Sequence, residues 1–248
     1  MKNIKLIFAY DGSSYLGWQQ VKEGATIEGE LSKVLTQIFQ HPIKLQVASR
    51  TDAGVHAQGQ VANFFTAKQL IDTNQLHYSL NQMLPPSIRI WEIGETAPTF
   101  HPTLEAKEKE YFYTLTTTPI QLPFDRHFAW HVRDCMDRVN MSIAANDLIG
   151  YHDFSSFCNI SESESESPYC TLSRLEVIEE SPETLRIALR GDRFLYKMAR
   201  NLVGTLVDVG RGKMTLQEVQ HLIEKKDRTQ AGVTAPAHGL CLKGVYYL

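Results

Sequence analysis

Hydrophobic and polar positions follow the period of a strand and then the period of a helix, in a regular succession along the first hundred residues. The helical pattern at 26–39 has its apolar positions on one stripe and Thr26 in place to cap it. The expected elements are a strand at 4–10, a helix at 26–39, strands at 44–49 and 60–65, a helix at 72–82 and a strand at 88–93. This β-α-β-β-α-β order is typical of a ferredoxin-like unit.

The second half follows a looser version of the same order, without any detectable sequence repeat. The expected elements are a strand at 109–117, a helix at 136–149, strands at 172–178 and 185–190, helices at 194–209 and 215–224 and a final strand at 240–247. We therefore predict an α+β fold of two ferredoxin-like halves, residues 1–104 and 105–248. The halves would form one continuous, mostly antiparallel sheet with helices on one face and a catalytic cleft between them.

Residues 161–167 alternate serine and glutamate and cannot contribute to a core. We expect a surface loop there, most simply a tolerated insertion, although phosphorylation or partner recognition would also suit such a segment.

Composition fits an ordinary globular protein of 248 residues, with 43% hydrophobic and 21% charged positions. The four cysteines lack the spacing of a disulfide framework or a metal site, so we expect reduced thiols in a cytoplasmic protein. No apolar run is long enough to span a membrane, and residues 1–10 do not resemble a signal peptide.

The formal net charge of −3 argues mildly against a polyanionic partner. Charge is unevenly distributed, however. Residues 190–228 hold nine Lys or Arg against five Asp or Glu, a local excess of four positive charges. This pattern suits either a modest nucleic-acid contact or a solvated helical face.

A short loop concentrates the reactive side chains of the first half. Arg50, Asp52 and His56 lie on a glycine-containing turn between two apolar, strand-like runs. Loops held by a rigid sheet commonly carry catalytic groups, and residues two apart in extended chain point to the same side. An Asx-type turn, in which Asp52 bonds its own backbone, explains the same residue types equally well.

Six sequence blocks occur in the order that characterises one enzyme family, and together they extend over essentially the whole chain. The blocks are residues 10–19, 49–61, 109–113, 153–157, 194–204 and 235–242. On these blocks the chain resembles the tRNA pseudouridine synthase A family. Two positions depart from the family pattern: Ser49 replaces the usual glycine, and Thr103 stands where an arginine available to the RNA backbone is expected.

The resemblance implies isomerisation of uridine to pseudouridine at positions 38, 39 and 40 of the tRNA anticodon stem-loop. The glycosidic bond breaks, the uracil turns within the site, and carbon 5 joins the ribose, so neither a metal nor an organic cofactor is required. Asp52 matches the catalytic aspartate and would be the nucleophile, since a carboxylate suits a sugar centre with oxocarbenium character. Attack on the ribose, addition to the uracil ring and removal of a sugar proton remain open.

The other site residues also follow from the resemblance. Tyr111 would stack on the uracil of the flipped-out nucleotide, and Arg200 would pair with Asp52. Arg50 would fill the space vacated by the base or bind a phosphate, and Leu240 would line the pocket. Without the motifs these side chains would be interpreted as a core tyrosine, solvated cations and a core leucine. We interpret His56 as structural and Tyr113 as a core residue.

Contacts to the RNA backbone are expected from basic residues of the second half, and the family resemblance implies a homodimer bound to tRNA. The expected contact residues are Lys107, Lys109, Arg190, Arg193, Lys197, Arg211 and Lys213. Two other functions fit parts of the pattern: a non-catalytic RNA-binding or folding-assistance protein, and a nucleoside hydrolase. The joint presence of Asp52, Tyr111 and Arg200 favours the enzyme over the binding protein, and release of free uracil would favour the hydrolase over the isomerase.

Overall fold

A computed structural model describes residues 1–68, 72–159 and 167–247. The chain forms two compact units: unit 1 contains Met1–Lys107 and Cys241–Leu248, and unit 2 contains Glu108–Leu240. The sequence placed the division at 104 and the last strand in the second half. The structure groups that strand with unit 1, because Cys241 and Leu242 pair with His56 and Ala57 of β3 in parallel register.

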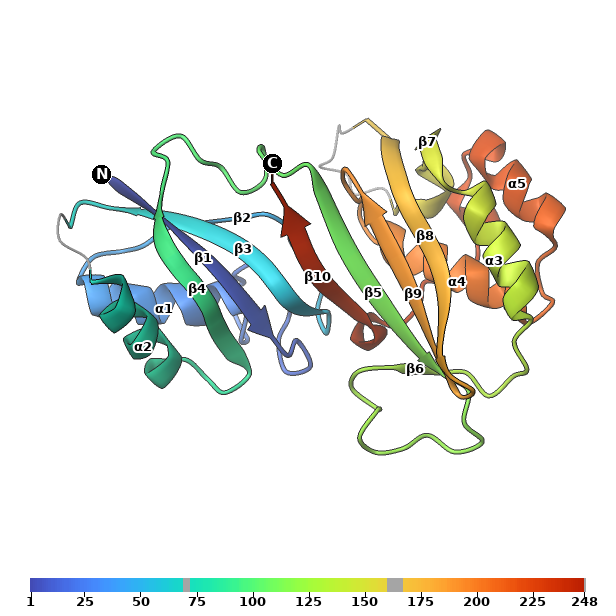
Figure 1. Cartoon of the computed structure of the whole chain (residues 1–248), viewed down its shortest axis with the longest axis horizontal. Helices are drawn as coiled ribbons and strands as arrows, with labels where there is room; N and C mark the ends of the chain where they lie inside the picture. Colours follow the sequence, from blue (N-terminus) through green and yellow to red (C-terminus); the bar gives the residue numbers. More distant parts are fainter. Residues whose placement is uncertain (69–71, 160–166, 248) are drawn as a thin grey trace. The chain divides into compact units, whose positions relative to one another are not determined.

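Unit 1 has the predicted β-α-β-β-α-β order (Figure 1). Its elements are β1 (Lys2–Tyr10), α1 (Ile27–Phe39), β2 (Leu45–Val47), β3 (His56–Thr66), α2 (Thr73–Met83) and β4 (Ile88–Thr96). Strand β1 lies between β3 and β4 and is antiparallel to both, while β2 and the parallel β10 (Leu240–Tyr246) pair with different parts of β3. The predicted α+β class is confirmed.

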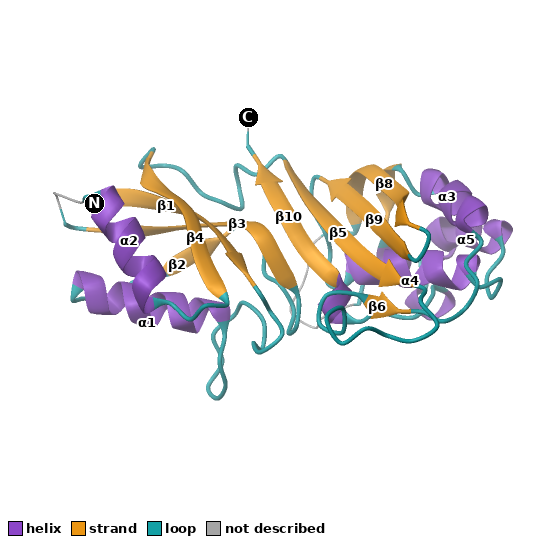
Figure 2. Ribbon diagram, turned by 60° about the horizontal axis from the view of Figure 1, so that its bottom comes forward, coloured by secondary structure: helices purple, strands orange, loops and turns teal. Residues whose placement is uncertain are grey.

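The core of unit 1 is built from alternate positions of β1 and one stripe of α1. Ile4, Leu6 and Phe8 are fully buried, as are Ile27 and Leu31. Helices α1 and α2 lie on the same side of these strands (Figure 2). The predicted cap of α1 is confirmed, because the Thr26 hydroxyl oxygen accepts a hydrogen bond from the Gly29 amide. A strand alternating in this way buries one face under its helices.

Among its described residues, unit 2 has a mostly antiparallel sheet and three α-helices (Figure 1). Its elements are β5 (Glu108–Thr116), β6 (Trp130–His131), α3 (Arg138–Asp147), β7 (Gly150–Asp153), β8 (Tyr169–Ser181), β9 (Thr184–Gly191), α4 (Met198–Gly210) and α5 (Leu216–Lys225). Within the unit, β9 lies between β5 and β8 and pairs with both, and β7 pairs with β8. Strands β6 and β7 were not predicted, since two and four residues carry too little periodicity.

Helix α4 differs from its prediction at its start. The predicted start at residue 194 is wrong: Lys197 has φ of 60°, a left-handed conformation that no helix continues, and α4 begins at Met198. Twelve of its thirteen residues are buried, and Arg200 is the exception. The predicted start of α3 at 136 is likewise two residues early, because the Asp137 side chain caps this helix.

Candidate active site

The loop containing Asp52 connects β2 to β3 and is fixed at Thr51. The Thr51 hydroxyl lies 2.7 Å from the Tyr10 hydroxyl, and the Thr51 carbonyl accepts from the Trp18 amide at 3.0 Å. Thr51 is buried, whereas Arg50 is exposed and Asp52 is half-buried. The buried Thr51 therefore fixes the loop, while the charged side chains on either side of it, Arg50 and Asp52, retain access to solvent.

A tight backbone turn follows Asp52. The Asp52 carbonyl accepts from the Val55 amide at 3.1 Å, and the Gly54 amide donates to the Tyr15 carbonyl at 3.3 Å. Gly54 has φ of 80°, the value that the third residue of a type II turn requires and that glycine adopts without strain.

A second loop, residues 11–18, supports the Asp52 loop at close range. A Cβ at Gly17 would lie 2.7 Å from the Thr51 carbonyl oxygen and 3.0 Å from the Asp52 carbonyl carbon. Gly17 also has φ of 94°. Glycine is therefore needed at this position for its backbone conformation and for the close approach of the two loops.

His56 joins the same two loops from the start of β3. Its Nδ1 lies 3.0 Å from the Gly12 amide nitrogen, which donates to it, and 3.2 Å from Asp11 Oδ1. The ring is only 4% exposed. The burial of the ring and its contacts to residues 11 and 12 support a structural role for His56.

The two tyrosines of β5 have different surroundings. Tyr111 is 5% exposed, and its ring meets Phe194 edge to face with centroids 4.9 Å apart. Tyr113 is fully buried, and its hydroxyl donates to the Pro236 carbonyl at 2.8 Å. Burial raises the pKa of Tyr113 strongly, against the opposing effect of the Arg200 charge. The core interpretation of Tyr113 is confirmed.

Arg200 is bound to the segment that precedes β10. Its Nε donates to the Ala235 carbonyl at 2.8 Å, and the Ala235 amide donates to the Arg200 carbonyl at 3.1 Å. Leu240, at the start of β10, is buried. Arg200 is thus a charged side chain with a defined orientation on an otherwise buried helix.

The predicted RNA-contacting residues of unit 2 are divided between the two ends of α4. Lys109 pairs in register with Gly191, the last residue of β9, and Arg190 precedes Gly191 in that strand. Arg193 and Lys197 follow β9 in the chain, before α4 begins. Arg211 and Lys213 follow the C-terminal end of α4. Thirteen helical residues span about 20 Å, so the two groups are separate surfaces.

Several of these cations have protein partners. Arg190 forms an ion pair with Glu108 at 2.6 Å, Arg211 forms one with Asp134, and the Arg193 guanidinium donates to the Ser167 carbonyl. Lys197 Nζ lies 4.9 Å from the Tyr196 ring centroid, and Lys213 is exposed. Phosphate binding by Arg190 or Arg211 would have to compete with a carboxylate.

Arg228 belongs to the packing of unit 2. Its guanidinium donates to Asn201 Oδ1 and to the Thr234 hydroxyl, both at 2.9 Å, and to the Gly232 carbonyl at 2.9 Å. Burial lowers the pKa of this guanidinium. The charge excess in residues 190–228 therefore overstates the charge available to a ligand.

Side chains of the block at 153–157 bind the end of α5 and the residue that follows it. Asp153 pairs with Lys226 at 2.8 Å and accepts from the Ser155 amide at 3.0 Å. Burial raises the pKa of Asp153, but the bonds from Lys226 and Ser155 outweigh it, and the net pKa lies below the usual range. Ser156 donates to the Leu222 carbonyl at 2.5 Å. The resemblance located this block without indicating that it supports the fold.

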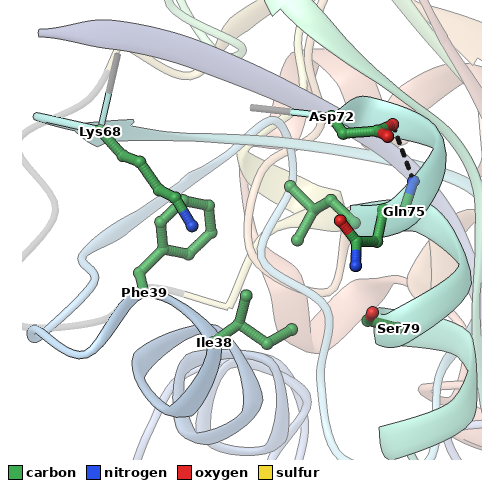
Figure 3. A pocket seen from close by; sticks show the side chains of 7 residues that line it. Ile38, Phe39, Lys68, Asp72, Gln75 and Ser79 are labelled. Carbon is green, nitrogen blue, oxygen red and sulfur yellow. Dashed lines mark hydrogen bonds between the residues drawn. The ribbon is translucent and has the colours of Figure 1, made fainter. Parts of the chain in front are cut away.

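A hollow of about 580 Å³ in unit 1 is unrelated to the predicted site (Figure 3). It lies between the end of α1 and the start of α2 and is lined by Ile38, Phe39, Lys68, Asp72, Gln75, Leu76 and Ser79. None of these is a predicted site residue. Within the described ranges, no group of three or more His, Cys, Asp or Glu side chains could hold a metal ion.

Similar proteins were found by sequence and by structure. The model of a tRNA pseudouridine synthase family matches residues 6–103 and 144–248. The chain is 44% identical to tRNA pseudouridine synthase A 2 of Protochlamydia amoebophila, covering all of this chain and 95% of the relative. It is 39% identical to tRNA pseudouridine synthase A of Pelobacter propionicus, with both chains fully covered.

Similarity to solved structures is more distant. A chain of the Cbf5-Nop10-Gar1 complex aligns with a TM-score of 0.42 and 11% identity, covering 96% of this chain and 48% of that chain. This value is too low to support a conclusion. The family match and the full-length relatives decide the question: this chain is an isomerase of the tRNA pseudouridine synthase family.

Proposed function

We propose that this enzyme converts uridine to pseudouridine in tRNA, at positions 38, 39 and 40 of the anticodon stem-loop. The bond from ribose C1′ to uracil N1 breaks and a bond from C1′ to uracil C5 forms, while the proton on C5 is lost and N1 gains one. The product is an isomer of the substrate, and the reaction needs no oxidant or reductant.

Asp52 is the proposed nucleophile on a flipped-out uridine. Its loop is held by the Thr51 contacts and by the close approach of Gly17, while the Asp52 side chain retains access to solvent. This fixed but accessible carboxylate, within the sequence block that matches the family, is the observation that carries the proposal. A rigid mount places a nucleophile without further ordering when the substrate binds.

The remaining site residues are proposed for substrate binding. Tyr111 would contact the uracil, and its present packing against Phe194 implies that Phe194 moves when the base enters. Arg200 would hold the Asp52 carboxylate, and Leu240 would line the pocket. Arg50, which is exposed, would fill the space of the flipped base or bind a phosphate.

The proposed RNA surface uses Lys109, Arg190, Arg193 and Lys197 at one end of α4 and Arg211 and Lys213 at the other. We further propose that the enzyme acts as a homodimer in the cytoplasm, the compartment of its tRNA substrate. None of the helices among the described residues is long and apolar enough to cross a membrane.

Asp52→Asn tests the proposal because it removes the charge and keeps the size. We expect no pseudouridine at positions 38–40 of unmodified tRNA transcripts, with tRNA affinity within a few-fold of the unsubstituted enzyme, measured by nucleotide-resolution mapping and filter binding. Asp72→Asn is the matched control, since Asp72 caps α2 and asparagine caps equally well. Product formation by Asp52→Asn would refute the assignment, and release of free uracil would indicate a nucleoside hydrolase.

A further inference from the structure

Residues 235–239 are held by contacts from three directions within unit 2. The Ala235 carbonyl accepts from Arg200 Nε at 2.8 Å, and the next carbonyl, that of Pro236, accepts from the Tyr113 hydroxyl at 2.8 Å. His238 Nε2 lies 3.1 Å from the Ala129 carbonyl oxygen. A Cβ at Gly239 would lie 2.5 Å from Tyr113 Cζ, so this backbone packs directly on the tyrosine ring.

The Ala235 and Pro236 carbonyls lie in adjacent peptide planes that are joined at Pro236, whose ring fixes φ at −53°. Because only ψ of Pro236 can still turn one plane against the other, fixing the Pro236 carbonyl restricts the orientation of the Ala235 carbonyl, which is the acceptor for Arg200. Arg200 is the only residue of α4 that is not buried, and its guanidinium donates to the Ala235 carbonyl. The Tyr113 ring is fully buried and belongs to β5, so it provides a rigid reference for this segment.

We propose that Tyr113 is a positioning residue for the isomerase reaction: its hydroxyl fixes the Pro236 carbonyl, and through Ala235 it sets the direction of the Arg200 guanidinium. The inference rests on the proposed function of Arg200 and adds a residue that does not itself touch the substrate. Tyr111 and Tyr113, two positions apart on the same strand, then have different tasks.

The chain offers a matched control for removing this hydroxyl. Tyr247 is half-buried, and its hydroxyl donates to a proline carbonyl, that of Pro102, at 2.7 Å in unit 1. Tyr113→Phe and Tyr247→Phe therefore delete the same type of hydrogen bond at similar length. A difference in rate constant between the two variants therefore depends on where the lost hydrogen bond lies, since both variants lose a tyrosine hydroxyl.

We expect Tyr113→Phe to lower the single-turnover rate constant for pseudouridine formation by about 10- to 100-fold, with tRNA affinity within about twofold. Tyr247→Phe should retain the rate constant. In 15N-labelled protein, the Nε–H resonance of Arg200, assigned by its loss in Arg200→Lys, should shift or exchange faster with solvent in Tyr113→Phe alone.

Equal rate constants in Tyr113→Phe and Tyr247→Phe, or an unchanged Arg200 resonance, would overturn the inference. A loss of tRNA affinity in place of the rate constant would also overturn it. If Tyr113→Phe does not fold, Gly239→Ala replaces it, because this change displaces the ring and keeps the hydroxyl; an unchanged rate constant there would count against the proposal. An inactive unsubstituted enzyme would refute the proposed function, whereas the Arg200 resonance would still test the positioning.

Discussion

At the scale of single residues, the Asp52 loop depends on glycines as much as on charged groups. Gly17 has a left-handed conformation and lies against the backbone of both Thr51 and Asp52. Gly54 completes the turn that follows Asp52. Asp52 is the proposed nucleophile of this loop, but its backbone geometry depends on Gly17 and Gly54.

Gly17→Ala is predicted to reduce both stability and activity. The new methyl group would have to displace the Thr51 carbonyl, and the backbone conformation itself disfavours alanine, so we expect a loss of about 1–3 kcal/mol in the free energy of unfolding. Denaturant melts and single-turnover assays measure the two effects. Gly94→Ala is the control, since a Cβ at Gly94 meets nothing within 4 Å; equal behaviour of both variants would contradict the prediction.

The departure at Thr103 has a local explanation. Its hydroxyl donates to the Val47 carbonyl at 2.6 Å, just ahead of the Asp52 loop. A threonine in this position ties the 101–105 turn to β2, where the family resemblance led us to expect an arginine directed at RNA.

At the scale of elements, unit 2 is organised around α4. The helix is buried on all sides except at Arg200, and the segment 228–235 packs along it through Arg228, Asn201 and Gly232. A Cβ at Gly204 would lie 1.6 Å from the Val233 carbonyl oxygen, so the segment contacts the helix backbone itself. The block at 194–204 therefore combines the half-buried Arg200 with a set of packing residues.

The ion pair between Asp153 of β7 and Lys226, which follows α5, predicts a pH dependence of stability. The pKa of Asp153 is lowered in the folded state, so its contribution is complete above its unfolded pKa of about 4 and is lost as pH falls through the folded value. Asp153→Asn should cost about 1–3 kcal/mol at pH 7, and the difference from the unsubstituted protein should shrink below pH 4.

Thermal melts between pH 3 and pH 7 provide the measurement for this prediction. Asp147→Asn is the control, because Asp147 is exposed and accepts a single bond from Gln220. A destabilisation by Asp153→Asn that does not change with pH would show that the Lys226 ion pair contributes nothing to stability.

At the scale of the whole molecule, charge partners matter more than net charge. The chain is acidic overall, and several of its arginines are engaged by carboxylates or by backbone carbonyls. In the proposed RNA surface, exposed lysines such as Lys213 would bear a larger share of the contact than the sequence count implies. The proposed action on three adjacent nucleotides would fit recognition through backbone and shape.

Binding of tRNA is predicted to weaken with added salt, because phosphate contacts release counterions. Lys213→Gln should reduce the slope of log affinity against log salt by about one, and Lys33→Gln on α1 should leave it unchanged. Filter binding over a range of KCl concentrations measures both slopes. A slope that is unaffected by Lys213→Gln would remove the C-terminal end of α4 from the RNA surface.

Sedimentation equilibrium tests the proposed homodimer. We expect a mass near twice that of the 28.2 kDa chain at micromolar concentration. A monomer that retains full activity under the same conditions would contradict the proposal.

The sequence by itself determined the order of elements in unit 1, the cap at Thr26 and the position of the Asp52 loop, because periodicity, caps and turns depend on neighbouring residues. The tertiary structure decided the start of α4, the assignment of the last strand to unit 1 and the partners of the arginines. Arg190 and Glu108 are 82 positions apart in the chain, and the carbonyl that holds Arg200 belongs to a residue 35 positions away. Which charges remain available to a substrate follows from such distant contacts, and local patterns do not encode them.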